Sequence, residues 1–165
     1  MGRLTGRVAW VTGSSRGIGR VVADHLASLG ANVAIHGTTP TSTQQLGEGA
    51  SLAAVADEIS KAHGTEVLAV HGDLTDESVV AGNVSDIREK FGKIDILINN
   101  AGGDIGSKGV TAENAGKPIQ NDAIHIPLAE VDTIINRNLR TCILVTRAVV
   151  PEMMERNEGW VVTVG

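Results

Sequence analysis

The chain has 165 residues, with 14 basic and 19 acidic side chains and a net charge of −5. This length suits one domain with a sizeable core, and the charge pattern lacks the basic stripe typical of nucleic-acid binding. No apolar run approaches the ~18 residues of a membrane span, and residues 1–6 contain no signal-peptide core, so we expect no membrane association. Cys142 is the only cysteine, which excludes an internal disulfide and fits a reduced, cytoplasmic setting.

Short apolar runs alternate with helical patterns, which predicts βαβ units and a parallel sheet. The expected strands are residues 7–11, 32–36, 66–71, 94–99 and 160–164. The expected helices are residues 16–29, 52–62, 77–91 and 128–156. Right-handed crossovers place helices on both faces, so we predict a three-layer, doubly wound α/β fold of the Rossmann type with strand order 3-2-1-4-5. No helix follows the fifth strand, which should therefore be an uncovered edge.

Two polar stretches are expected to be loops, residues 37–51 and residues 103–127. A loop as long as the second is uncommon in a compact domain without a function, and we expect a mobile flap. The helix after it should turn an apolar face inward and kink near Pro151. The side chains of that face are Val131, Ile134, Ile135, Leu139, Ile143 and Val150.

A glycine-rich turn lies between the first strand and the first helix, at Gly13, Gly17 and Gly19. Glycine permits a turn with positive φ and lets backbone approach a ligand closely. The helix that follows directs unpaired N–H groups and the positive end of its dipole toward the turn, where a phosphate can bind. Turns use glycine for other reasons too, but this position between strand and helix favours a nucleotide site.

Four motifs in order identify a resemblance to the classical short-chain dehydrogenase/reductases, over residues 8–164. The segment from Thr12 to Gly19 resembles the T-G-x-x-x-G-I-G turn of that family, and residues 99–102 resemble its N-N-A-G segment. Asp73 lies in a similar acidic turn after the third strand, and Asn138 lies where the family has a helical active-site asparagine. Residues 100–102 end the fourth strand beside the first, at the switch point where doubly wound folds bind ligands.

The resemblance implies a nicotinamide-dependent oxidoreductase that transfers a hydride to or from a small carbonyl or alcohol substrate. It assigns cofactor binding to Gly13, Ser15, Arg16, Gly17, Ile18, Gly19, Thr38, Asp73, Leu74, Asn100, Ala101 and Gly102. Asn138 is the implied catalytic residue, which holds water and backbone in a proton relay. Relatives usually pair through the helix that begins at Leu128 and the helix that follows it, which is missing here, so we expect a homo-oligomeric parent enzyme.

The catalytic Tyr-x-x-x-Lys and the active-site serine of the family are missing, and the chain contains no tyrosine. We therefore expect residues 1–165 to be an incomplete NAD(P)-binding domain, the N-terminal part of a longer enzyme, with little or no activity of its own. The alternatives are a non-catalytic NADP-binding module and an adenosylmethionine-dependent methyltransferase. A methyltransferase would account for the glycine turn and Asp73, but not for residues 99–102 or Asn138.

The charge pattern after the second strand favours NADP over NAD as the cofactor. NAD-binding folds place an acidic side chain there for the ribose 2′-hydroxyl, but no acidic residue occurs between Asp24 and Glu48. Arg16, with Thr38 or Thr39, could bind a 2′-phosphate instead. The five histidines show no metal-ligand spacing, so we predict no metal site.

Overall fold

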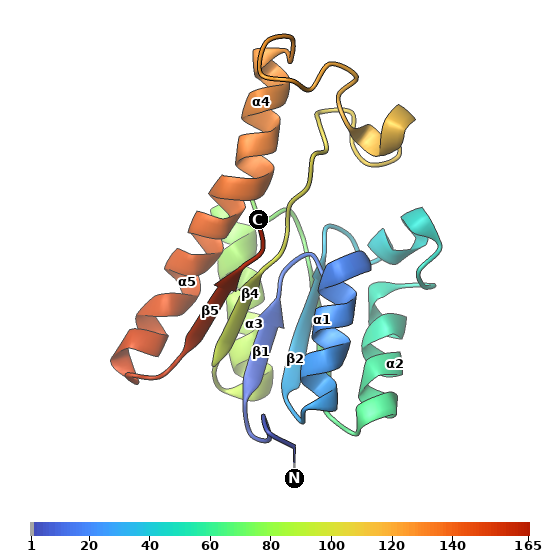
Figure 1. The fold of residues 1–165 in the computed structure, drawn as a ribbon. Helices are drawn as coiled ribbons and strands as arrows, with labels where there is room; N and C mark the ends of the chain where they lie inside the picture. Colours follow the sequence, from blue (N-terminus) through green and yellow to red (C-terminus); the bar gives the residue numbers. More distant parts are fainter. Residues whose placement is uncertain (1) are drawn as a thin grey trace.

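The computed structural model describes residues 2–165, except for the side chains of Gln45 and Leu46. Its centre is a five-stranded parallel sheet in the order β3-β2-β1-β4-β5 (Figure 1). The strands are β1 (Val8–Val11), β2 (Asn32–Gly37), β3 (Val67–His71), β4 (Ile96–Asn99) and β5 (Trp160–Thr163). The predicted strand order is confirmed, and β5 is an exposed edge strand.

Helices cover both faces of the sheet, as Figure 1 shows. On one face lie α1 (Gly17–Ser28) and α2 (Leu52–His63), and on the other lie α3 (Glu77–Phe91) and α5 (Thr141–Glu155). The side chains of a strand point alternately to opposite faces. Ala9 and Val11 therefore belong to the α1–α2 core, whereas Val8 and Trp10 belong to the α3–α5 core. This double coverage explains the continuous apolar sequence of β1.

The ends of α2 and α3 follow directly from local sequence. The Ser51 side chain accepts a hydrogen bond from the Ala54 amide at 3.1 Å, and Asp76 accepts one from the Ser78 amide at 2.8 Å. Each carboxylate or hydroxyl oxygen satisfies an amide that the helix itself cannot pair. At the other ends, Gly64 and Gly92 adopt the left-handed conformation that terminates a helix.

The predicted helix 128–156 is present from Leu128 to Glu155, but a π-helical turn interrupts its regular α-helical geometry. Its segments are α4 (Leu128–Ile135), the π-helical turn η3 (Asn136–Arg140) and α5. The inward orientation predicted for Ile135, Leu139 and Ile143 is wrong, because each is about half exposed. The buried side chains of α5 are Thr141, Val145, Val149 and Met153. A π turn inserts an extra residue, which shifts the buried face, and α4 extends past the end of the sheet (Figure 1).

The segment 103–127 folds back beside α4 and contains a short 3-10 helix, η2 (Glu113–Gly116). The Glu130 carboxylate on α4 accepts hydrogen bonds from the Ser107 amide at 2.7 Å and the Ser107 hydroxyl at 2.6 Å. These bonds hold the pKa of Glu130 below its usual value. A second short helix, η1 (Ser42–Leu46), occupies part of the stretch 37–51 that was predicted to be loop.

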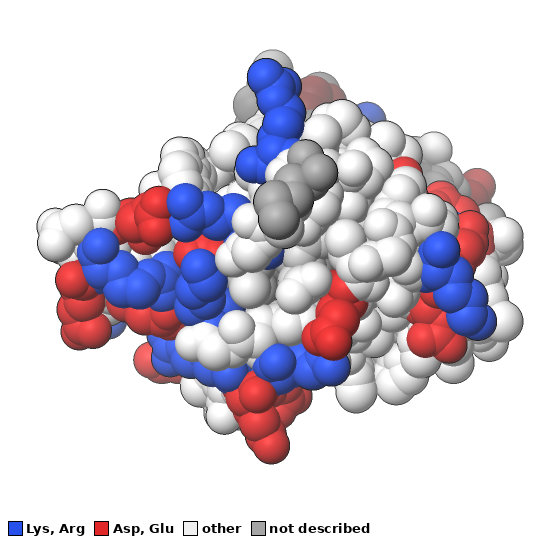
Figure 2. Space-filling view, turned by 90° about the horizontal axis from the view of Figure 1, so that it is seen from below, with Lys and Arg blue, Asp and Glu red and all other residues white. Residues whose placement is uncertain are grey.

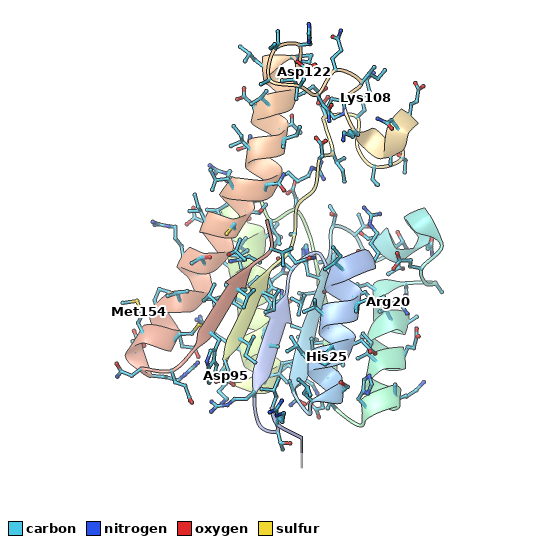
Figure 3. The ribbon with its side chains drawn as sticks, in the orientation of Figure 1. Arg20, His25, Asp95, Lys108, Asp122 and Met154 are labelled. Atoms are coloured by element: carbon cyan, nitrogen blue, oxygen red, sulfur yellow. The ribbon has the colours of Figure 1, made fainter. Side chains whose placement is uncertain are left out.

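The fully buried Asp95, which Figure 3 shows near the lower end of the sheet, lies close to three cationic side chains. Its carboxylate accepts a hydrogen bond from the Val8 amide at 2.9 Å and lies 3.0 Å from the ammonium of Lys93. The guanidinium groups of Arg7 and Arg156 lie 3.7 and 3.6 Å from it. Figure 2 shows Lys/Arg and Asp/Glu side chains intermixed on this lower face. Asp95 thus ties the amino-terminal ends of β1 and β4 together.

We predict that Asp95→Ala lowers the free energy of unfolding by about 3 kcal/mol, because it leaves partly buried cations and a buried amide without their partner. Urea denaturation followed by circular dichroism measures the change. Glu158→Ala is the matched control, since Glu158 also pairs with Arg7 but lies at the surface. An Asp95 variant no less stable than this control would contradict the prediction.

Candidate functional site

The site begins where β1 and β4 end side by side. The Thr12 hydroxyl donates to the Ile98 carbonyl at 3.2 Å and accepts from the amides of Asn100 and Ala101 at 3.0 Å each. The Asn100 side-chain amide in turn donates to the carbonyls of Thr12 and Gly13, both at 3.1 Å. The glycine turn and the segment after β4 are therefore joined into one rigid edge at the switch point of the sheet.

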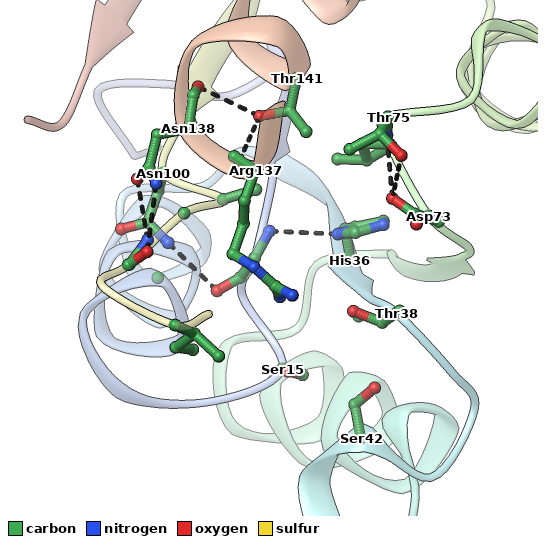
Figure 4. Close-up of a pocket in the computed structure, with 18 of the residues that line it drawn as sticks. Ser15, His36, Thr38, Ser42, Asp73, Thr75, Asn100, Arg137, Asn138 and Thr141 are labelled. Atoms are coloured by element: carbon green, nitrogen blue, oxygen red, sulfur yellow. Dashed lines mark hydrogen bonds between the residues drawn. The ribbon is translucent and has the colours of Figure 1, made fainter. Parts of the chain in front are cut away.

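His36, near the end of β2, holds the same turn from the other side. Its ring Nδ1 accepts from the Gly13 amide at 3.2 Å, and its backbone carbonyl accepts from the Ser15 amide at 3.0 Å. Its own amide donates to the Ser14 hydroxyl at 2.8 Å. The Gly13 amide can only donate, so the ring is the neutral tautomer with a proton on Nε2. That nitrogen donates to the Gly72 carbonyl at 3.0 Å (Figure 4).

Burial of the His36 ring disfavours its charged form and lowers its pKa from 6.5 to about 4. Only 3% of the residue is exposed. Protonation of Nδ1 would replace the acceptor of the Gly13 amide with a donor. The turn is therefore held by an imidazole that must remain neutral.

The glycines of the turn serve two different purposes. Gly17 has a φ of +55° and no heavy atom near the position of a Cβ, so it supplies a left-handed conformation beside open space. A Cβ on Gly19 would collide with the Asn100 side chain and the Gly13 carbonyl. Gly19 thus permits α1 to pack against the turn, while Gly17 leaves the first turn of α1 accessible.

A carboxylate already lies at that accessible helix end. The Gly17 amide donates to both carboxylate oxygens of Glu48, at 2.9 and 3.2 Å. The Arg20 guanidinium donates to the backbone carbonyl of Glu48 and, at 2.8 Å, to the Glu58 carboxylate. Helix N-termini attract anions because their first amides lack partners. The argument from an acid-free stretch after β2 therefore missed Glu48, which returns to the turn from beyond η1.

Asn138 joins the helical segments to the segment that leaves β4. Its Oδ1 accepts from the Gly103 amide at 2.8 Å, and its Nδ2 donates to the Gly103 carbonyl at 3.1 Å. The same Nδ2 donates to the Ile134 carbonyl of α4 at 2.8 Å, one helical turn earlier. Asn138 thus holds backbone at the start of the segment 103–127.

These elements enclose a pocket of about 700 Å³ along the carboxyl edge of the sheet (Figure 4). All thirteen residues that the sequence assigned to a site line it: Gly13, Ser15, Arg16, Gly17, Ile18, Gly19, Thr38, Asp73, Leu74, Asn100, Ala101, Gly102 and Asn138. The Asp73 carboxylate accepts from the amide and hydroxyl of Thr75, at 3.0 and 2.8 Å. The pocket thus runs from Thr38 at the end of β2 to Asn138 beyond β4.

Sequence reasoning missed several residues of this pocket. His36, Ser42, Thr75, Arg137 and Thr141 also line it, and Glu48 contacts its turn. The sequence did contain a signal for two of them: His36 lies near the end of β2, and Thr75 lies in the turn after β3. Ligands of doubly wound folds bind at the carboxyl ends of the strands. The others come from η1, the residues just after it, η3 and α5, whose placement depends on tertiary packing.

Within residues 2–165, no three His, Cys, Asp or Glu side chains gather closely enough to hold a metal ion. Across the same residues, no helix combines the length and the apolar character needed to cross a bilayer.

A doubly wound parallel sheet with a glycine turn, an exposed helix N-terminus and a switch-point pocket defines a protein of the nucleotide-binding α/β class. The sequence matches the model of the short chain dehydrogenase family over residues 7–165. The chain belongs to this family of oxidoreductases.

Known relatives agree with the family and with the fold. The chain is 38% identical to a cyclohexanol dehydrogenase of Rhodococcus sp. (strain TK6), over 98% of this chain and 57% of that protein. An NAD⁺-bound xylitol dehydrogenase superposes with a TM-score of 0.77 at 27% identity, over 98% of this chain and 53% of the other. A metagenomic short-chain oxidoreductase in complex with NADP superposes with a TM-score of 0.74 at 32% identity, over 97% and 62%. The chain thus spans between about half and three fifths of the length of these relatives.

We predict that acid destabilises the protein through His36. The folded-state pKa of about 4 lies below the unfolded value of 6.5, so the unfolded state binds more protons between these values. The stabilising contribution is complete above the unfolded pKa and is lost as pH falls toward 4. From about pH 8 to about pH 5 this loss is about 2 kcal/mol.

Urea unfolding at the two pH values, on the parent chain and on His36→Gln, measures this contribution. The variant should be less stable at the higher pH and should lack this part of the acid sensitivity. His25→Gln is the control, because His25 is exposed on α1. Equal pH dependence in His36→Gln and the parent would show that the imidazole is not held neutral.

Proposed function

We propose that the pocket binds NADP or NAD and that residues 1–165 are the cofactor-binding domain of a short-chain oxidoreductase that acts on a small carbonyl or alcohol compound. The observation that carries this proposal is the position of the pocket. It lies over the exposed first turn of α1, at the point where β1 and β4 diverge, and the rigid Thr12–Asn100 edge forms its floor. A pocket volume of about 700 Å³ suits a dinucleotide.

The residues of the pocket divide between the two ends of such a ligand. Thr38 and Asp73 lie at the β2–β3 side, where the family resemblance puts the adenosine. Gly102 and Asn138 lie at the β4 side, where it puts the nicotinamide, which supplies the hydride chemistry when bound. The chain's own contribution at that end is to fix the Gly103 backbone through Asn138.

We propose that the 165-residue chain binds the cofactor without appreciable turnover. Carbonyl reduction requires a proton donor within hydrogen-bond reach of the reacting oxygen. The chain contains no tyrosine, and the histidine nearest in sequence to Asn138, His125, instead pairs with Asp122 at 2.9 Å. Asn138 remains the one proposed catalytic residue, through the backbone it positions.

We further propose that the cofactor is NADP rather than NAD, with Arg16, Ser15 and Thr38 around its 2′-phosphate. All three residues line the pocket, and Figure 4 shows Ser15 and Thr38 on the same side of it. Glu48 reduces this preference, because its carboxylate occupies the Gly17 amide beside Arg16 and repels a second anion. Neutral substitutions of Arg16 and of Glu48 separate the attraction by the arginine from the repulsion by the carboxylate.

Exposed apolar side chains support a proposed homo-oligomeric parent. Leu128 is 80% exposed and Leu139 is 57% exposed, and both lie on the α4–η3 segments that extend beyond the sheet. Large apolar side chains left exposed together commonly mark a protein interface.

The first prediction from this proposal is that the chain binds NADPH or NADH and not adenosylmethionine. Isothermal titration calorimetry with the three ligands tests it. Gly17→Val should abolish dinucleotide binding, because its side chain would project into open space above α1 and strain the positive φ. Circular dichroism checks that the variant is folded. Tighter binding of adenosylmethionine than of either dinucleotide would sink the oxidoreductase proposal.

A second prediction concerns the phosphate. Arg16→Ala should weaken NADPH binding more than NADH binding, whereas Glu48→Gln should tighten NADPH binding, each by about fivefold in the ratio of dissociation constants. Glu89→Gln, an exposed change on α3, is the control. Should NADH bind more tightly than NADPH, or should neither variant alter the ratio, the assignment of the 2′-phosphate to this end is wrong.

A further inference from the structure

Arg137 lies in the middle of the pocket, although no motif of the sequence pointed to it. The residue belongs to the π-helical turn η3 and lines the pocket, and its side chain points from the helix into the cavity (Figure 4). Its Nε is buried and lacks a hydrogen-bond partner among the described residues. Within the same part of the chain, Arg137 forms no ion pair within 4.0 Å.

An arginine in this state is unusual on physical grounds. The guanidinium keeps its charge at every physiological pH, and a buried N–H without a partner is costly. Two other arginines, Arg140 and Arg156, show how such groups are normally satisfied. Arg140 donates to the Thr75 carbonyl at 3.3 Å, and Arg156 donates to the Ile94 carbonyl at 2.9 Å. Among the described residues, the Nε of Arg137 has no comparable acceptor, so an acceptor from a ligand would complete its bonding.

Arg137 and Asn138 are consecutive residues of the π turn, and both line the pocket. Successive residues of a helix point in different directions, and π turns commonly occur at functional sites. Asn138 turns toward Gly103 at the β4 side, whereas Arg137 projects over the middle of the pocket toward the elements β1 and β2. The pocket is therefore lined by a cation from the helical side, Arg137, in addition to Arg16 from the glycine turn.

We propose that Arg137 binds a phosphate group of the dinucleotide. The planar guanidinium fork matches the oxygens of a phosphate, and such charge-assisted bonds are stronger than neutral ones. The inference rests on the proposed function, because it requires that a dinucleotide occupies this pocket. The phosphate is either part of the diphosphate bridge or the 2′-phosphate of NADP, and the ligands of the test distinguish them.

The test is isothermal titration of the 165-residue chain and of Arg137→Gln with NADPH, NADH, ADP, 2′-AMP and adenosine. Gln has no charge but a similar length, and circular dichroism verifies folding. We expect the affinity for phosphate-bearing ligands to fall about tenfold or more, with adenosine affinity unchanged. Losses with NADH and ADP identify the diphosphate, whereas losses confined to NADPH and 2′-AMP identify the 2′-phosphate.

Two further variants test whether the loss of affinity in Arg137→Gln is only a structural effect. Arg147→Gln removes the same charge from the exposed face of α5 and should leave every affinity unchanged. Arg137→Lys keeps the charge and should retain part of the affinity that Arg137→Gln loses. If the parent chain binds neither dinucleotide, the proposed function and this inference both fail. If the parent binds and Arg137→Gln binds equally well, or loses adenosine affinity to the same extent, only the inference fails.

Discussion

The buried hydroxyl of Thr12 bonds three backbone groups of β4 and its continuation, and the geometry of the pocket depends on this junction. Parallel strands pair through backbone bonds only as far as they remain adjacent. Past Val11 the chain turns toward α1, while past Asn99 it turns toward the segment 103–127. Thr12 and Asn100 replace the ladder bonds that are lost where the strands diverge, so the space between the diverging segments has a rigid floor.

Later elements are fastened to this floor by a small number of side chains. His36 attaches β2 to the glycine turn, and Asn138 attaches the helical segment to Gly103 through a two-way amide contact. Each of these side chains uses both a donor and an acceptor, so its orientation is fixed. The pocket is therefore preorganised at its β2 and β4 sides. Such preorganisation reduces the ordering that a ligand would have to impose.

The fold could be predicted because its signals are local. Apolar runs predicted the strands. Asp76 and Gly64 indicated helix ends, and the glycines at positions 13, 17 and 19 predicted the turn after β1. The exposed face of Ile135 and Leu139 could not be predicted, since an ideal helical period does not anticipate a π turn. Glu48 and Arg137 were missed for another reason. Their positions relative to the turn depend on how η1 and η3 pack, and no spacing in the sequence records that contact.

The two missed charges act on the pocket in opposite ways. Glu48 satisfies the Gly17 amide in the free chain, so an anion of a ligand must compete with a carboxylate for the helix N-terminus. Arg20 holds the backbone carbonyl of Glu48, not its carboxylate. The Glu48 side chain can therefore rotate away while its backbone stays anchored. Arg137 has no such internal partner among the described residues, and it contributes an unopposed positive charge from the helical side. A phosphate that entered the pocket would be attracted by the Arg137 guanidinium and repelled by the Glu48 carboxylate.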